Sequence, residues 1–161
     1  MPNEPASGAA PARPIVFLNP ETVRHLDRAG LVAESRAAIG VAGQRSFRDE
    51  PVDALNALCE AAGALLVGTA PIPGIADVRG FLVGIGVRAE FGPEWLAGTL
   101  ATDRKGAIAQ WCERHGSPLC VVIDRPGAAP SRAIRINVPE GHSLTRAAAD
   151  QALALLGLSN D

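Results

Sequence analysis

Apolar residues in this chain fall into two patterns, short continuous runs and runs with helical spacing. Continuous apolar runs lie at 14–18, 64–67 and 119–123, and weaker strand patterns at 87–91 and 133–138. Between them, residues such as Leu55, Leu58 and Cys59 recur at the spacing of one helix face. Buried strands that alternate with amphipathic helices are typical of a parallel sheet covered on both faces. The pattern predicts an α/β fold, a three-layer α/β/α sandwich around a mainly parallel sheet.

The same pattern divides the chain into a tail and one domain. Residues 1–13 are rich in Pro and Ala without apolar periodicity, which is typical of a disordered tail, and 14–161 form a single domain. Residues 31–50 show only hints of a short helix, and their role stays open. Helices are predicted at 20–29, 51–62, 75–85, 103–115 and 144–155.

Polar residues follow several predicted strands directly. Asn19 and Glu21 follow the first strand, Thr69 the second and Asp124 the run at 119–123. Because ligands of parallel α/β sheets bind outside the carboxyl ends of the strands, we expect these residues to converge on one rim. Each also has a local explanation: Asn19 caps a helix, Glu21 complements the helix dipole, Thr69 forms a turn, and Asp124, which could otherwise hold a metal, caps a loop. Lys105 lies in the first turn of a helix, where a cation is unfavourable, and this favours a role in holding an anion.

Composition narrows the class of protein. The 161 residues are 47% hydrophobic and 20% charged, as in a folded globular domain, and the formal net charge of −2 argues against a protein that coats nucleic acid. The apolar runs are too short to span a membrane, and the chain does not open on a secretory signal. Cys59, Cys112 and Cys120 lack the spacing of zinc or redox motifs. We therefore expect a soluble cytoplasmic protein with reduced thiols.

Common catalytic motifs are missing from the sequence. It contains neither a phosphate-binding G-x-x-x-x-G-K-[ST] loop nor a G-x-S-x-G nucleophile elbow. Its histidines, His25, His115 and His142, are far apart and have no Cys or carboxylate at ligand spacing, so a zinc site is not expected.

Four segments together resemble the haloacid dehalogenase superfamily, and more narrowly the small domain of this superfamily found in bacterial Swiss Army Knife RNA-repair proteins and their stand-alone relatives. They are F-L-N-P-E-T-V at 17–23, L-N-A-L-C at 55–59, K-G-A-I-A-Q-W at 105–111 and V-V-I-D at 121–124. The resemblance covers about residues 14–157. It implies a Rossmann-like parallel sheet with little or no cap domain.

The resemblance also assigns roles, and the chain departs from several of them. In that superfamily one Asp attacks phosphorus and a second, two residues later, exchanges protons. These positions correspond to Asn19, whose amide cannot supply the attacking oxygen, and to Glu21. Thr69 and Lys105 (or its neighbour Arg104) take the phosphate-binding roles, and Asp124 the metal-binding role. Because other family carboxylates are missing, the implied Mg²⁺ site is weakened.

These departures lead to one expected function and two alternatives. We expect a catalytically degenerate domain, a pseudo-phosphatase, that binds a phosphorylated small molecule or a nucleic-acid end, or interacts with a protein partner that the sequence does not identify. The first alternative is an atypical, Mg²⁺-dependent phosphatase that uses Glu21 or Asp124, acting on nucleic-acid or nucleotide phosphates. The second is a purely structural partner, for instance in a homodimer.

Overall fold

The computed structural model describes residues 13–23, 50–96 and 103–157. Residues 1–12 of the predicted tail, the predicted helix beyond Val23, and residues 31–49 of the segment 31–50 lie outside the described residues.

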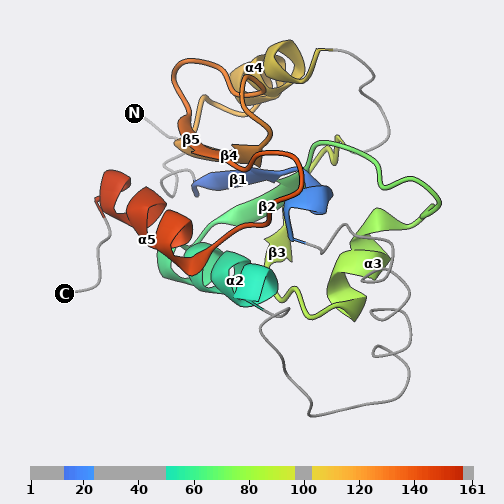
Figure 1. Cartoon of the computed structure of the whole chain (residues 1–161). Helices are drawn as coiled ribbons and strands as arrows, with labels where there is room; N and C mark the ends of the chain where they lie inside the picture. The colour runs from blue at the N-terminus through green and yellow to red at the C-terminus, as the bar shows by residue number, and fades with distance from the viewer. Residues whose placement is uncertain (1–12, 24–49, 97–102, 158–161) are drawn as a thin grey trace, which may run out of the picture.

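Five parallel strands form the sheet, in the order β3-β2-β1-β4-β5 (Figure 1). They are β1 (Ile15–Leu18), β2 (Leu65–Gly68), β3 (Glu90–Phe91), β4 (Cys120–Asp124) and β5 (Ile134–Asn137). Every pairing is parallel, which confirms the predicted α/β, Rossmann-like class. The strand expected at 87–91 shortens to the two residues of β3.

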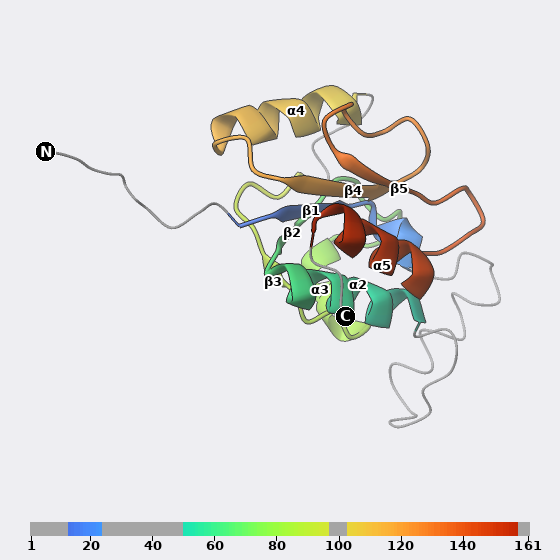
Figure 2. The ribbon, with the colours of Figure 1, turned by 90° about the vertical axis from the view of Figure 1, so that its left-hand side faces the viewer.

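A short 3-10 helix and four α-helices accompany the strands in the described part of the chain, with α5 following the last strand. They are η1 (Pro20–Val23), α2 (Glu50–Ala62), α3 (Val78–Gly84), α4 (Arg104–Arg114) and α5 (Arg146–Leu155). Figure 2 shows α4 on one side of the sheet and α2, α3 and α5 on the other. Gly63 and Gly116, with φ of 63° and 83°, follow α2 and α4 and lie directly after the helix ends that the sequence predicts at 62 and 115.

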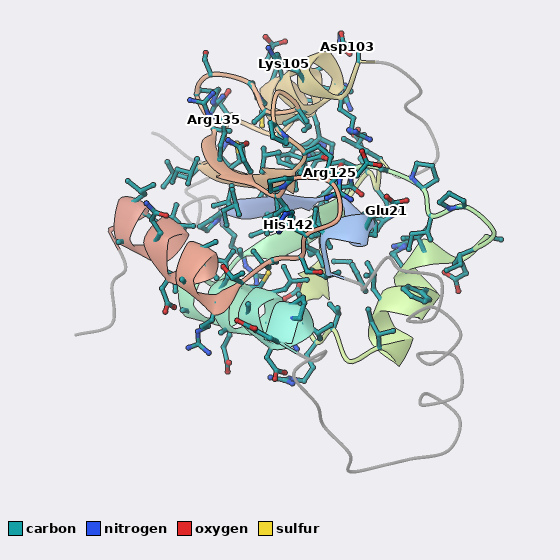
Figure 3. All side chains as sticks on the ribbon, in the orientation of Figure 1. Glu21, Asp103, Lys105, Arg125, Arg135 and His142 are labelled. Atoms are coloured by element: carbon teal, nitrogen blue, oxygen red, sulfur yellow. The ribbon has the colours of Figure 1, made fainter. Side chains whose placement is uncertain are left out.

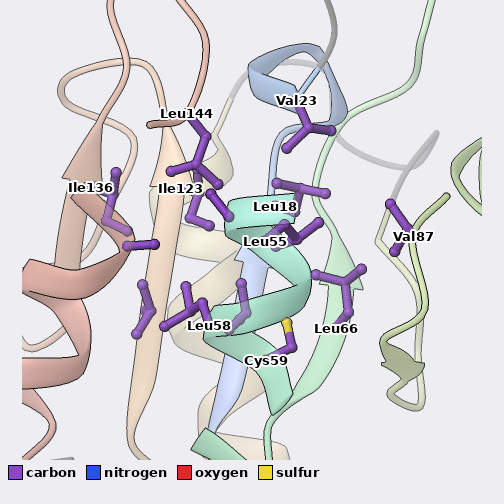
Figure 4. Close-up of a cluster of buried hydrophobic side chains, with 14 of the residues drawn as sticks. Leu18, Val23, Leu55, Leu58, Cys59, Leu66, Val87, Ile123, Ile136 and Leu144 are labelled. Carbon is purple, nitrogen blue, oxygen red and sulfur yellow. The ribbon is translucent and has the colours of Figure 1, made fainter. Parts of the chain in front are cut away.

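Two buried clusters fill the spaces on either side of the sheet. Val16 and Leu18 of β1 pack with residues of α2 and α5 (Figure 4), whereas Ile15 and Phe17 face α4. On the α4 side, the Trp111 ring meets the Phe17 ring edge-on with 5.2 Å between centroids. Side chains therefore alternate along each strand between the α4 side and the opposite side of the sheet. The same alternation determines which way the first residue after each strand points.

Two predicted helices begin later than expected. Ile75 lies in a turn before α3, where its N–H donates to the Ile72 carbonyl, and Leu144 precedes α5. The caps set the starts instead: Asp77 accepts a hydrogen bond from the Gly80 N–H, and Thr145 from the Ala148 N–H.

Candidate functional site

Three polar residues stand side by side at the carboxyl edge of the sheet. Leu18 of β1 is in register with Gly68 of β2 and Ile123 of β4. The ladder continues one step further, because the Asn19 N–H donates to the Ile123 carbonyl at 2.9 Å and the Thr69 N–H to the Leu18 carbonyl at 2.8 Å. Thr69, Asn19 and Asp124 therefore occupy one row across the three central strands. All three are buried.

The side chains of this row point toward α4. Leu18, one residue earlier, packs in the cluster on the opposite side of the sheet, and side chains alternate between faces along a strand. A direct contact agrees with this: the Arg104 Nε, at the start of α4, lies 3.0 Å from the Asp124 Oδ2. The row thus lies beneath the N-terminus of α4.

Asn19 has a structural role and also contacts the next strand. Its Oδ1 accepts from the Glu21 N–H at 3.1 Å, and its backbone carbonyl accepts from the Thr22 N–H at 2.9 Å, so it caps η1 as the sequence indicated. Its Nδ2 donates to the Asp124 Oδ1 at 2.8 Å. Because the oxygen receives the Glu21 N–H, the orientation of the amide is fixed with its nitrogen toward Asp124.

Asp124 is a buried carboxylate that is compensated on both oxygens. Oδ1 accepts from the Asn19 amide and from the Arg125 N–H at 2.6 Å, and Oδ2 faces the Arg104 guanidinium. The Arg104 guanidinium is close enough to the Asp124 Oδ2 to form an ion pair, but its N–H groups are not aligned for a hydrogen bond to that oxygen. Burial of an isolated carboxylate is very costly, so these partners explain how Asp124 is kept in the fold.

Thr69 differs from its two neighbours. Its side chain is fully buried, yet its Oγ1 has no hydrogen-bond partner among the described residues. A buried hydroxyl without a partner costs about 1–3 kcal/mol.

The Mg²⁺ implied by the family resemblance does not fit the described residues of the row. The groups around Asp124 are N–H donors and a guanidinium, which repel a cation, whereas Mg²⁺ requires oxygen ligands. Among the described residues, no cluster of three or more His, Cys, Asp or Glu side chains is placed to hold a metal ion.

A cleft of about 380 Å³ lies beside the row, between the start of α4 and the segment after β4. It is lined by 103–105 and 125–128. Three of the lining residues are cationic, Arg104, Lys105 and Arg125, and one is acidic, Asp103. The Asp103 Oδ1 accepts from the Gly106 N–H at 2.9 Å, so the end of α4 already has a carboxylate cap and the cleft depends on its side-chain cations.

Arg125 connects the cleft to Glu21. Its Nη1 donates to the carbonyls of Val138 and Pro139, and its Nη2 lies 3.7 Å from the Glu21 Oε1. Figure 3 shows the labelled Arg125 and Glu21 side chains at the same end of the sheet. Glu21 is partly exposed, so a carboxylate oxygen lies near the cleft.

A second cavity, of about 250 Å³, lies at the opposite edge of the sheet, where β2 and β3 begin. Arg13, Asn56 and Arg88 are among its lining residues. The Asn56 amide is committed to the Gly86 carbonyl and the Arg88 N–H, so this buried group is satisfied by the backbone.

The comparisons with known proteins add no assignment. No family model, curated protein or solved structure matches this chain. None of the helices in the part of the chain that the structure describes is both long and apolar enough to cross a membrane. The chemistry of the site therefore rests on its own geometry.

Three of the five predicted site residues lie side by side in the structure, and the other two lie at the adjacent cleft. The row contains Asn19, Thr69 and Asp124. Lys105 lines the adjacent cleft, and Glu21 lies near the cleft because it is paired with the lining residue Arg125. Sequence reasoning gave no role to Arg125. Its position directly after a buried strand that ends in an acid was the available signal.

Proposed function

We propose that this chain is a non-catalytic binding domain for a phosphorylated ligand, a haloacid-dehalogenase-like scaffold with an amide at the position of the nucleophile. The observation that carries the proposal is the hydrogen bond from the Asn19 Nδ2 to the Asp124 Oδ1 at 2.8 Å.

This hydrogen bond engages the side chains of both Asn19 and Asp124, the two residues of the row from which a nucleophile or a metal ligand would be expected. The Asn19 oxygen is occupied by the Glu21 N–H, and an amide oxygen is a poor nucleophile. Asp124 has donors or a cation at both oxygens, which lowers its nucleophilicity and its availability to a metal. The chemistry supported by the row is therefore binding without turnover.

The cleft supplies the charge for the ligand. Arg104, Lys105 and Arg125 line it, and guanidinium and ammonium groups bind phosphate oxygens by charge-assisted hydrogen bonds. Arg104 lies 3.0 Å from the buried Asp124, whereas Arg125 is more loosely paired with Glu21 at 3.7 Å. This leaves Lys105 and Arg125 as the principal cations for the ligand. A phosphate end on a small molecule or on a nucleic acid has the matching chemistry.

Calorimetric titration with inorganic phosphate and with a 5′-phosphorylated oligonucleotide tests binding. We expect Lys105→Ala and Arg125→Ala each to weaken binding at least tenfold. The matched control is Arg146→Ala, which removes an exposed arginine paired with Asp150 on α5, across the sheet from α4. Equal affinity in all four proteins would refute the cleft as the binding site.

Turnover is measured separately, as phosphate release from an aryl phosphate with Mg²⁺. We expect the wild type to be inert, and turnover by the wild type would overturn the non-catalytic proposal. The second candidate, an atypical phosphatase, is favoured by Glu21, whose Oε1 lies 3.7 Å from the Arg125 Nη2 beside the cleft. It predicts measurable release that is abolished in Glu21→Gln or Asp124→Asn.

A further inference from the structure

Arg125 presents only one edge of its guanidinium to a ligand. Its Nη1 donates to the carbonyls of Val138 and Pro139, at 3.1 and 2.9 Å, which anchors the side chain to the segment after β5. The other guanidinium donors, on Nε and Nη2, make no hydrogen bond within the part of the chain that the structure describes. Because Arg125 lines the cleft, an anion in the cleft meets the Nε and Nη2 edge of a side chain that is already held in place.

Glu21 stands at that same edge of the guanidinium (Figure 3). Its Oε1 lies 3.7 Å from the Arg125 Nη2, which is within ion-pair range and too long for a hydrogen bond. The position of Glu21 is fixed by η1, because its N–H donates to the Asn19 Oδ1 at 3.1 Å. Its side chain is partly exposed, so its oxygens are open to a ligand. Asp103, the acidic residue that lines the cleft, already caps α4 through its Oδ1.

A phosphate bound to Arg125 would therefore share a nitrogen with Glu21. A phosphate oxygen that accepts from the Arg125 Nη2 lies about 2.8 Å from that nitrogen. The Glu21 Oε1 lies 3.7 Å from the same nitrogen, so the two oxygens become close neighbours. Two ionised oxygens repel each other at this range, whereas a proton on the ligand oxygen converts the repulsion into a short O–H···O⁻ hydrogen bond.

We propose that Glu21 makes the cleft selective for an oxyanion that carries a proton, namely hydrogen phosphate or a phosphate end in its protonated form. Arg125 and Lys105 attract the anion, and the Glu21 carboxylate accepts the hydrogen bond of the P–O–H group. Sulfate and phosphodiesters carry charge without this proton, so they leave the carboxylate facing an anion and bind weakly. The inference rests on the proposed function, because it requires the cleft to bind phosphate.

A plain ion pair with Arg125 is the alternative role of Glu21. In that role the carboxylate only neutralises the guanidinium, and removal of its charge strengthens the binding of every anion by the same factor. The two roles therefore differ in the ratio of the phosphate affinity to the sulfate affinity. Glu21→Gln separates them, because the amide keeps the length of the side chain, carries no charge and can donate a hydrogen bond to sulfate.

Calorimetric titration of the full-length protein with inorganic phosphate and with sulfate at pH 7 tests the inference. Both anions are tetrahedral, but phosphate still carries a proton at this pH and sulfate carries none. We expect the wild type to bind phosphate about tenfold or more tightly than sulfate, and Glu21→Gln to reduce this preference to about twofold, mainly by a gain in sulfate affinity. The matched control is Glu60→Gln, which removes an exposed carboxylate near the end of α2 and keeps the wild-type preference.

The possible results separate this inference from the proposed function. Equal binding of both anions by the wild type overturns the inference and leaves the proposed phosphate binding in place. An equal gain for both anions in Glu21→Gln overturns it in favour of the plain ion pair. Failure of the wild type to bind either anion refutes the proposed function and the inference with it. If Glu21→Gln does not fold, Glu21→Asp replaces it: this variant keeps the charge and withdraws the acceptor, and an unchanged preference overturns the inference.

Discussion

Replacement of Asn19 by Asp tests the central contact of the candidate site. The substitution keeps the shape of the side chain and exchanges the Nδ2 donor for an oxygen that would lie about as close to the Asp124 Oδ1 as the present 2.8 Å. Two ionised carboxylates cannot share that buried position, so the folded protein restores the hydrogen bond by binding a proton. The cost of the substitution is therefore the cost of protonating a carboxyl group at the pH of the experiment.

The magnitude follows from the reference acidity of aspartate. An unfolded Asp titrates at about 3.9, and each unit between that value and the solution pH costs about 1.4 kcal/mol. The loss of stability is then about 4 kcal/mol at pH 7, about 1.5 kcal/mol at pH 5 and below about 0.5 kcal/mol near pH 4. The sign follows because the introduced carboxyl group has its pKa raised by folding. Its full contribution to stability is present below the unfolded pKa and is lost as the pH rises.

Urea unfolding of the wild type and of Asn19→Asp at these three pH values measures the effect. The control is the exchanged pair Asn19→Asp/Asp124→Asn, which again has one amide and one carboxylate and regains most of the loss at pH 7. A loss of stability that is equal at pH 4 and pH 7 would show that the cost is steric, and would refute the argument from charge.

Three further predictions concern the surroundings of the site. Thr69→Val removes a buried hydroxyl that has no partner among the described residues, so we expect a gain of about 1–3 kcal/mol in urea unfolding; a loss would show that the hydroxyl has a partner. Gly68→Ala would place a methyl group in collision with the Trp95 ring, which packs against Gly68. We expect the free energy of unfolding to fall by about 1–3 kcal/mol and the Tm to decrease. The control is Gly84→Ala, where the added Cβ has open space. Burial raises the pKa of the Cys59 thiol from 9.0 to about 12. The stability that the neutral thiol contributes to the folded protein is therefore complete below pH 9 and declines toward pH 12. The urea midpoint of Cys59→Ala should fall less over this pH range than that of the wild type.

The strands and the rim could be predicted from the sequence because strands that are buried on both faces of a sheet appear as continuous apolar runs. Segments such as Val121–Ile123 are continuous apolar runs, and a polar residue that ends such a run must lie at an edge of the sheet. The register that aligns Asn19 with Asp124 could not be predicted, because it depends on which strands become neighbours.

Helix starts were less predictable because apolar spacing reports burial and not backbone conformation. Leu144 is buried and fits the spacing of the last helix, yet Thr145 caps α5 one residue later. The ion pair between Arg104 and Asp124 was similarly hidden, because it joins the first residue of a helix to the last residue of the following strand. Such contacts arise from packing, and residue spacing does not encode them.

The stability of the row and its proposed lack of turnover have the same physical origin. Asp124 is kept in the fold by three groups that donate or carry positive charge, and one of them is the Asn19 amide. A carboxylate at position 19 would supply a nucleophile and remove a donor from its buried neighbour at the same time. An active site of the aspartyl-phosphate type would therefore need a cation to separate the two carboxylates, in the place where this chain has a hydrogen bond. Recovery of activity through Asn19→Asp alone would thus require Mg²⁺ to bind between the pair, and stabilisation of that variant by Mg²⁺ at pH 7, absent in the wild type, is the measurement that shows it.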